Sequence, residues 1–363
     1  MHLSEQDYLE LLEFFQPGQS VAICGHVNPD GDCLGSAVAL GLFLEAHGCQ
    51  VVKLLASGNT PPRRYNFLQG YHFSSVLDYQ DSPDLFIAVD LSDIKRLGDA
   101  ASVTKRAGQV LVIDHHQGYS GFADHALIDP DSAATGLLVW NLIKASGEKA
   151  EAEAEAEAVT ADIASACYVA MMTDTGRFAY QNTGVDVFEA AASMVRAGAD
   201  PALLNRLVYE ERLESSLQLD ALVINRLEYL DEEKKVVCSW VTSDDYRDLG
   251  VDRSDTENLS VILRSIQGVE VVILLREEGD LPHNRGVDQS SEGHDQMQAQ
   301  EDDNGKLIRV NLRSKSDFDV GKLAASFGGG GHQGAAGYNF RGERSVVLSN
   351  LMPVLGNSGF SIL

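Results

Sequence analysis

The sequence has few of the features that a secreted or membrane-embedded protein would show. It contains only five cysteines, an odd number with no Cys-x-x-Cys pair, which argues against a disulfide framework and favours reduced thiols. No apolar run approaches the roughly 20 residues that a membrane-spanning helix needs, and the first residues lack the basic and apolar regions of a signal peptide. We therefore expect a soluble, cytoplasmic protein with no membrane partner.

Positive charge is also scarce. The chain of 363 residues has 28 Lys and Arg against 54 Asp and Glu, a net charge of −26. Because proteins that bind long nucleic acids usually carry a basic surface, long duplexes and long single strands are not expected as partners. A short oligonucleotide or a mononucleotide needs only a local basic pocket and metal ions. The alternative explanation of the acidity is solubility or adaptation to salt.

The hydrophobic patterns predict an α/β protein. Strands and helices alternate over residues 1–205, which is typical of a mostly parallel sheet covered by helices. Residues 206–230 read as a helical connector, and residues 231–363 as a smaller α/β domain. We predict strands near 20–25, 50–55, 84–90, 109–114, 234–241, 269–275 and 307–313, and helices near 5–15, 33–47, 134–146, 160–173, 186–197, 201–211, 212–230, 256–266, 319–326 and 342–355.

Two acidic segments interrupt this pattern. Residues 148–158 alternate Glu and Ala, which favours an exposed helix or a frayed loop. Residues 277–305 have almost no apolar side chains and predict a disordered insert. We assign neither segment a role in the chemistry.

The first candidate site follows the predicted strand 20–25. His26, Asp30 and Asp32 lie within seven residues, and Pro29 and Gly31 force a turn between them. In open α/β sheets this strand edge is where ligands bind, so the cluster indicates a metal site. The alternative is an ordinary turn, with Asp30 in an Asx-turn and Asp32 as the N-cap of the next helix.

Two further segments that follow predicted strands supply similar ligands. Asp90 ends a predicted strand, where one carboxylate could bridge two metals, or it could cap the next helix, a role that Asp93 could fill instead. Asp114, His115 and His116 follow another strand. The two histidines point to opposite sides of an extended chain, so one should bind metal while the other faces the substrate or a carboxylate; Asp114 could orient a histidine.

Asp174 ends a predicted apolar helix, where its charge opposes the helix dipole and favours a nearby cation. The combined set contains histidine and carboxylates without thiolates. That chemistry suits Mn²⁺, with Mg²⁺ or Co²⁺ as substitutes, better than a structural zinc.

The smaller domain carries a candidate substrate site. Arg313 and Ser314 end a predicted strand, and arginine is well suited to phosphate. The glycine-rich segment downstream would let the backbone approach a ligand closely. We expect a loop that holds substrate, formed by Gly328, Gly329, Gly330, Gly331 and His332.

These motifs, in this order, resemble those of the DHH phosphoesterase family. The segments are His26–Ser36, the strand-end Asp90, Asp114-His115-His116 and Thr173-Asp174-Thr175-Gly176, and the later Arg313-Ser314-Lys315 and Gly328–His332 resemble the family's DHHA1 domain. The chain is most similar to the bacterial oligoribonuclease/pAp-phosphatase group (nanoRNase type). The resemblance implies a DHH domain and a DHHA1 domain, with the active site in the cleft between them.

The resemblance also implies residue roles. One Mn²⁺ would be held by His26, Asp30 and Asp90, and the other by Asp32, Asp90, His115 and Asp174. Asp114 would support the site, and His116 would contact the scissile phosphate. Arg313, Ser314, Gly328, Gly329, Gly330, Gly331 and His332 would hold the substrate.

The expected activity is hydrolysis of short single-stranded RNA oligonucleotides to mononucleotides, with removal of the 3′-phosphate from pAp. The alternative is a cyclic dinucleotide (c-di-AMP) phosphodiesterase, and a catalytically silent nucleotide-binding protein is a third possibility. The apolar helices over 186–211 predict a homodimer.

Overall fold

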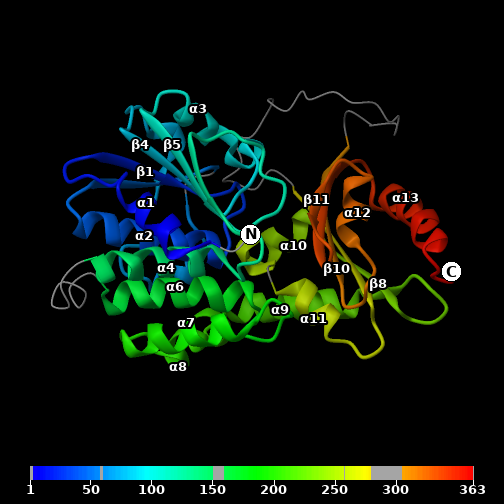
Figure 1. Ribbon diagram of the computed structural model, residues 1–363. Helices are drawn as coiled ribbons and strands as arrows, with labels where there is room; N and C mark the ends of the chain where they lie inside the picture. Colours follow the sequence, from blue (N-terminus) through cyan, green and yellow to red (C-terminus); the bar gives the residue numbers. More distant parts are fainter. Residues whose placement is uncertain (1–2, 58–59, 150–158, 257, 279–304, 363) are drawn as a thin grey trace. The chain divides into compact units, whose positions relative to one another are not determined.

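The computed structural model describes residues 3–57, 60–149, 159–256, 258–278 and 305–362. The chain divides into two compact units, Met1–Glu211 and Arg212–Leu363 (Figure 1). Most of the two predicted acidic segments, residues 150–158 and 279–304, lies outside the described residues. Glu277, which we expected in the disordered insert, is instead the last residue of a strand.

The first unit is built on a six-stranded sheet in the order β3-β2-β1-β4-β5-β6. All neighbouring strands run parallel, which confirms the predicted fold class. The strands are β1 Ser20–Cys24, β2 Gln50–Leu55, β3 Ser74–Ser75, β4 Leu85–Val89, β5 Gln109–Asp114 and β6 His125–Ile128. The order of the strands reverses between β1 and β4, and such a switch point opens a crevice at the carboxyl ends of the strands.

Helices cover both faces of this sheet (Figure 1). One face packs against α1, α2, α4 and α6, whose apolar side chains join those of the strands in one core. The other face packs against shorter segments, the 3-10 helix η3 and helix α3. The helices are α1 Glu5–Leu12, α2 Gly31–Ala46, η3 Ile94–Ala100, α3 Ala101–Thr104, α4 Thr135–Lys149, α6 Ala161–Asp174, α7 Val185–Arg196 and α8 Pro201–Asn205.

Helices α2 and α6 pack closely because small residues meet at their contact. A Cβ atom on Gly35 would lie only 2.6 Å from the carbonyl oxygen of Ala166. Both helices carry predicted metal ligands, Asp32 in the first turn of α2 and Asp174 at the end of α6. Their close packing therefore fixes these two carboxylates relative to each other.

The second unit contains a mixed six-stranded sheet in the order β11-β12-β10-β9-β8-β7. Only β8 and β9 are parallel; the other neighbouring strands of this sheet are antiparallel. The elements are α9 Glu214–Asn225, β7 Glu228–Tyr229, β8 Val236–Val241, α10 Ser243–Leu249, α11 Leu259–Arg264, β9 Val271–Glu277, β10 Leu307–Ser314, α12 Val320–Ala325, β11 Gly330–His332, β12 Ala335–Arg341 and α13 Arg344–Asn357.

The two faces of the second sheet are covered unequally. Helices α12 and α13 pack on one face across β8 to β12. On the opposite face, α9, α10 and α11 pack mainly on β8 and β9. The outer half of that face, over β10 and β12, carries the polar side chains described below.

Several predicted elements have different bounds in the structure. The helix predicted over 201–211 stops at Asn205 and continues as a π-helical turn, Arg206–Glu210. The helix predicted over 212–230 ends at Asn225 and is followed by strand β7. The glycine-rich segment predicted as a loop ends in strand β11.

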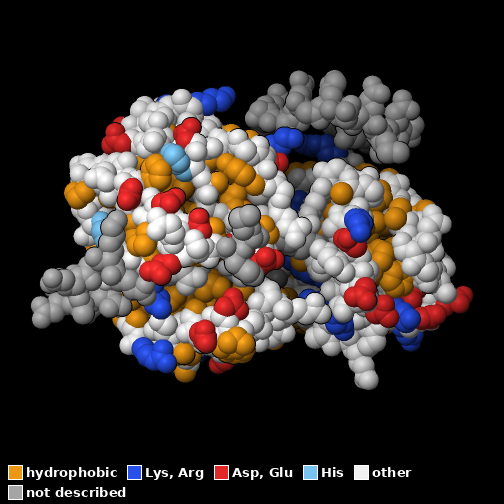
Figure 2. Space-filling view, viewed as in Figure 1, with side chains coloured by type: hydrophobic (Ala, Val, Ile, Leu, Met, Phe, Trp, Pro, Cys, Tyr) orange, Lys and Arg blue, Asp and Glu red, His pale blue; other side chains and the backbone are white. Residues whose placement is uncertain are grey.

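The surface matches the composition. Acidic side chains are scattered over the visible face of both units instead of gathering in one patch (Figure 2). Within the described residues, every helix is too short or too polar to cross a membrane.

Candidate metal centre

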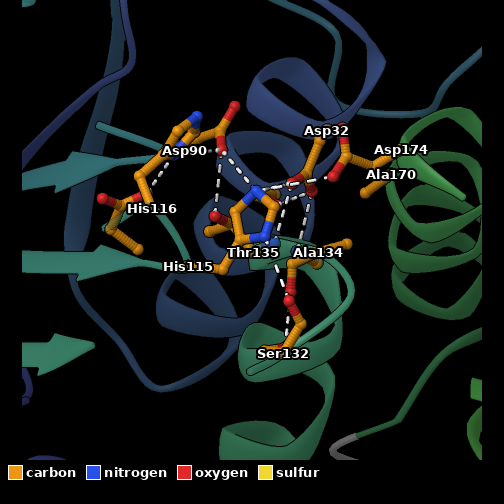
Figure 3. Close-up of polar contacts among 12 residues, drawn as sticks. Asp32, Asp90, His115, His116, Ser132, Ala134, Thr135, Ala170 and Asp174 are labelled. Atoms are coloured by element: carbon orange, nitrogen blue, oxygen red, sulfur yellow. Dashed lines mark hydrogen bonds and ion pairs between the residues drawn. The ribbon is translucent and has the colours of Figure 1, made fainter. Parts of the chain in front are cut away.

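Four of the predicted ligands of the first unit lie close together near the carboxyl ends of its strands: Asp32, Asp90, His115 and Asp174 (Figure 3). Asp90 directly follows β4, and His115 and His116 directly follow β5. The parallel register sets Val89 beside Ile113, so these strands end at the same edge. Among the described residues, donor atoms form three groups that could each hold a metal: His26–Cys33–Asp90, Asp90–His115–His116 and Asp32–His115–Asp174.

His115 lies at the centre of three carboxylates. Its Nδ1 lies 3.1 Å from the carbonyl oxygen of Ser132, which can only accept, so Nδ1 carries the proton and Nε2 presents a lone pair in the neutral ring. Nε2 lies 3.4 Å from Asp174 Oδ2, 3.6 Å from Asp90 Oδ1 and 3.7 Å from Asp32 Oδ2. Four electron-rich atoms converge on one point, an arrangement that a divalent cation stabilises.

His26 forms the second half of the centre. Its Nε2 lies 3.3 Å from Asp90 Oδ2 and 3.9 Å from Asp30 Oδ1. Its Nδ1 is buried and has no hydrogen-bond partner among the described residues, which is costly unless another group compensates. Because His26 and His115 contact different oxygens of Asp90, this carboxylate lies between the two groups of ligands.

Asp90 adopts a backbone conformation that few residues tolerate. Its φ of 63° lies in the left-handed region, which costs most side chains about 1–3 kcal/mol but is less unfavourable for Asp and Asn. The strained turn aims the carboxylate across the switch point. The alternative that Asp90 caps a helix is wrong, since Asp93 is the N-cap of η3.

The alternative in which Asp30 forms an Asx-turn and Asp32 caps the next helix assigns the N-cap to the wrong residue. Asp30, not Asp32, is the N-cap of α2 and accepts a hydrogen bond from the Cys33 N–H at 3.1 Å. The Asp30 side chain is 51% exposed. Asp32 is buried and accepts hydrogen bonds from the N–H groups of Thr135, at 2.7 Å, and Gly136, at 2.8 Å.

Thr135 connects two of the predicted ligands and was not predicted. Besides its N–H contact to Asp32, its hydroxyl donates to Asp90 Oδ1 at 3.1 Å. The residue is completely buried at the start of α4. It therefore orients both carboxylates through two different atoms.

The electrostatics of the buried carboxylates favour a bound cation. Burial and the charges of Asp90 and Asp174 raise the pKa of Asp32 well above its usual range. Burial and the charges of Asp30 and Asp90 likewise raise the pKa of Asp174. For Asp90 burial acts in the same direction, but the His26 hydrogen bond and the neighbouring imidazoles lower its pKa overall. Repulsion among these buried carboxylates disfavours their full ionisation, and a bound cation would favour it.

Cys33 was not among the predicted ligands. Its thiol lies with His26 and Asp90 in one of the three groups. Burial and the charges of Asp90 and Asp30 raise the pKa of this thiol well above its ordinary value. A protonated thiol is a poor ligand, so histidine and carboxylate oxygens remain the ligands that fit best.

His116 faces the rim of the centre. Its Nδ1 donates to Asp114 Oδ1 at 2.7 Å, and Asp114 is completely buried. Burial lowers the pKa of His116, but the hydrogen bond to Asp114 and the charge of Asp90 outweigh it, so the pKa is raised overall. On its other side, Nε2 lies 3.4 Å from Arg96 Nη1. Arg96 was not predicted.

The predicted substrate-binding residues of the second unit lie around β10, β11 and β12. Arg313 is half-buried and donates from Nη1 to the carbonyl oxygen of Leu312 at 3.0 Å. Ser314 is buried, and its hydroxyl donates to the Ser316 carbonyl oxygen at 3.0 Å. Successive side chains of a strand point to opposite faces, so Arg313 and Ser314 do not share a face.

The glycines have a structural role beside the expected one. A Cβ atom on Gly329 would overlap Gly337 O and Tyr338 Cβ, so this glycine lets the segment pack against β12. Gly328 and Gly331 have positive φ angles, whereas Gly330 has open space around it. The His332 backbone pairs with Ala335, and its side chain lies outside the described residues.

Arg313 belongs to a half-buried polar row on the sheet face opposite α12 and α13. Arg309 and Asn311 alternate with buried residues along β10 and therefore share its face. Arg276 of β9 pairs directly with Arg309 in the register. The hydrogen bonds here include Arg276 Nε to Asn311 Oδ1, at 3.1 Å, and Arg309 Nη1 to Asn339 Oδ1, at 3.2 Å.

Two family models match the chain. Residues 20–171 match the DHH family N-terminal domain, and residues 296–347 match the DHHA1 domain. The chain therefore contains a DHH domain and a DHHA1 domain, which confirms the resemblance predicted from the motifs, and it is an enzyme of the hydrolase class.

Similar proteins agree with this assignment. The chain is 27% identical to the bifunctional oligoribonuclease and PAP phosphatase NrnA of Thermus thermophilus, over 89% of this chain and 84% of that protein. The protein of the same name from Bacillus subtilis is 22% identical, over 94% of this chain and 96% of the relative. A solved structure, an exopolyphosphatase-related protein from Bacteroides fragilis, shares the fold with a TM-score of 0.80 at 23% identity, covering 98% of this chain and 96% of that one.

Proposed function

We propose that the protein hydrolyses short oligoribonucleotides to mononucleotides and removes the 3′-phosphate of pAp, with two Mn²⁺ ions as cofactors. The observation that carries the proposal is Asp90, whose two oxygens face two different histidines at 3.3 and 3.6 Å. A shared carboxylate of this kind is what a two-metal phosphoesterase needs. The names of the relatives from Thermus thermophilus and Bacillus subtilis support the substrate class.

The donor set fits two hard divalent cations. His26, Asp30 and Asp90 would hold one ion, and Asp32, Asp90, His115 and Asp174 the other. Bound ions would lower the pKa of a water molecule and neutralise charge on the phosphoryl oxygens. The chain itself keeps its carboxylates in place through Thr135, Gly136 and Ser36, which donate hydrogen bonds to Asp32 or Asp90.

The remaining polar residues would handle the substrate. His116, held by Asp114, would donate a hydrogen bond from Nε2 to the phosphate. Arg313, Ser314, the segment Gly328–Gly331 and His332 would hold other groups of the substrate. For Ser314 this would require its hydroxyl to exchange its present partner, the Ser316 carbonyl oxygen.

A panel of substrates tests the proposal. The purified full-length protein would be incubated with Mn²⁺ and pAp, pApA, c-di-AMP, a five-nucleotide RNA or a long RNA, with Asp90→Asn as the inactive control. We expect AMP from pApA, mononucleotides from the short RNA, and phosphate from pAp. Dominant cleavage of c-di-AMP would instead assign a cyclic dinucleotide phosphodiesterase, and a metal-bound protein without turnover on any of these substrates would contradict the enzyme proposal.

The predicted homodimer is also part of the proposal. Its support is a set of exposed apolar side chains on α7 and α8, with Val185 75%, Phe188 57% and Leu203 40% exposed. A molar mass of one chain, measured by light scattering at micromolar concentration, would contradict it.

The location of the active site between the two domains and the cytoplasmic location stay predictions.

A further inference from the structure

Arg96 is held in place beside the metal centre. It lies in η3, the turn that follows Asp90, and its N–H donates to the carbonyl oxygen of Asp93 at 2.9 Å. Its own carbonyl oxygen accepts from the Val27 N–H at 2.9 Å, directly after His26. The backbone of Arg96 is thus tied to both segments that carry ligands of the first metal group.

The side chain of Arg96 points at His116. It is half-buried, and Nη1 lies 3.4 Å from Nε2 of the imidazole. This is long for a hydrogen bond, and it requires Nε2 to accept, which excludes the protonated ring. An anionic oxygen at the same place would be a stronger partner for the guanidinium, since charge-assisted bonds are shorter and about twice as strong as neutral ones.

The charge balance of the centre makes Arg96 significant. The four predicted carboxylate ligands, Asp30, Asp32, Asp90 and Asp174, would balance the charges of two divalent cations. Outside this set, Asp114 is buried and contacts Nδ1 of His116. Arg96 places a positive charge on the opposite side of His116, beside Nε2, where an incoming phosphate would meet it.

We propose that Arg96 binds the phosphate group that is cleaved and favours a phosphomonoester over a phosphodiester. This inference rests on the proposed function. A terminal phosphate carries a charge of about −1.5 to −2 at pH 7, whereas a diester carries a single negative charge. The extra cation therefore stabilises bound pAp more than bound pApA, and it helps one centre to act on both kinds of ester.

The experiment compares Arg96→Met with Lys95→Met. Lys95 lies in the same turn, carries the same charge and is exposed, so its replacement controls for net charge and for the fold. A third variant, Arg96→Lys, keeps the charge but loses the planar fork. For each we would measure kcat/KM on pAp and pApA with Mn²⁺, the thermal midpoint, the Mn²⁺ affinity, and the affinity for inorganic phosphate by calorimetry with Mn²⁺ present.

We expect Arg96→Met to lower kcat/KM about 100-fold on pAp and about tenfold on pApA, because one charge-assisted contact is lost and its worth grows with substrate charge. The phosphate affinity of Arg96→Met should fall about tenfold, while its Mn²⁺ affinity stays at the wild-type value. Lys95→Met should match the wild type in every measurement. Arg96→Lys should lie between. Equal losses on both substrates, or unchanged phosphate affinity, would overturn the inference.

The same measurements give a different result if the proposed function itself is wrong. If the wild-type protein hydrolyses neither pAp nor pApA, the proposed activity is wrong, but calorimetry still decides whether Arg96 binds phosphate. A weaker phosphate affinity in Arg96→Met alone would then support the inference without turnover.

Discussion

The two sheets of this protein present their polar residues in opposite ways. In the first unit, the candidate site lies at the ends of parallel strands and consists mainly of buried carboxylates and imidazoles, with Asp32 1% and Asp90 2% exposed. In the second unit, the polar residues stand on the face of a mixed sheet and are mainly arginine and asparagine. Arg309, Asn311 and Arg313 alternate along β10 and are half-buried.

This difference predicts how each region responds to substitution. Buried ionisable groups depend on one another, because removing one partner leaves the others uncompensated in a region of low dielectric. Half-buried side chains on a strand are spaced by the pleat, about 13 Å between Arg309 and Arg313 at 3.3 Å per residue, so each acts more independently. Substitution of a buried ionisable group in the first unit should therefore abolish nearly all activity, whereas substitutions on the sheet face of the second unit should reduce activity by degrees.

The largest effect is expected for Asp90→Asn. Asparagine keeps the shape and tolerates the φ of 63°, so the fold survives while the shared negative charge is lost. Metal-assisted charge stabilisation of several kcal/mol corresponds to a loss of about 1000-fold or more in kcat/KM. The rise in thermal midpoint that Mn²⁺ causes in the wild type should disappear, because binding to the native state alone stabilises it.

Asp99→Asn is the matched control for this variant, since Asp99 is exposed in the same η3 segment. It should keep both the activity and the Mn²⁺-dependent shift. A full Mn²⁺ shift in Asp90→Asn would show that Asp90 does not hold metal.

The sequence predicted the first unit well, because local patterns decide its main features. Apolar runs gave strands β1, β2, β4 and β5 within a residue or two, and parallel strands bring residues that follow them to a common edge. Asp93 could be named as the alternative helix cap from its position alone, and it is the N-cap of η3. The proposed binding roles followed from the residue types that end the strands.

Contacts between residues distant in the chain were not predictable. Thr135 lies 103 residues from Asp32, and nothing in its local pattern distinguishes it from any threonine that starts a helix. Arg96 is similarly an ordinary arginine in a surface turn until the fold brings it to His116. Strand β11 was predicted as a loop because glycine has low strand propensity; its pairing with β12 overrides that preference.

The next largest effect is expected in the second unit, for Arg313→Gln. Removing one charge-assisted contact costs about 1.5–3 kcal/mol, so KM for pApA should rise about 10- to 100-fold with kcat nearly unchanged. The affinity of the variant for pApA should depend less on salt concentration than that of the wild type, since one phosphate contact is missing.

Lys322→Gln provides the comparison for Arg313→Gln. Lys322 lies on α12 in the same unit, and its side chain is 87% exposed. It should leave KM unaltered. A loss of kcat in Arg313→Gln as severe as that of Asp90→Asn would refute the graded response of this unit.

A smaller effect is expected for Thr135→Val, which removes a hydroxyl but keeps the volume and the N–H bond to Asp32. The orientation of Asp90 would then be less restricted, and supporting residues of this kind are worth about 10- to 100-fold in metal affinity. We expect a loss of about tenfold in Mn²⁺ affinity, measured by calorimetry. Thr135→Ser should restore most of it, and equal affinities of both variants would argue against a role for the hydroxyl.

The smallest effect separates the two roles of the glycines in the second unit. At Gly330 a Cβ atom meets nothing within 4 Å, whereas at Gly329 it would overlap β12. Gly329→Ala should therefore lower the free energy of unfolding by about 1–3 kcal/mol. Gly330→Ala should leave the thermal midpoint unchanged. Because we expect the substrate to approach this strand closely, the same variant should raise KM for pApA by a few-fold. An unchanged KM in Gly330→Ala would mean that this glycine-rich segment serves packing against β12 and that Arg313 acts without it.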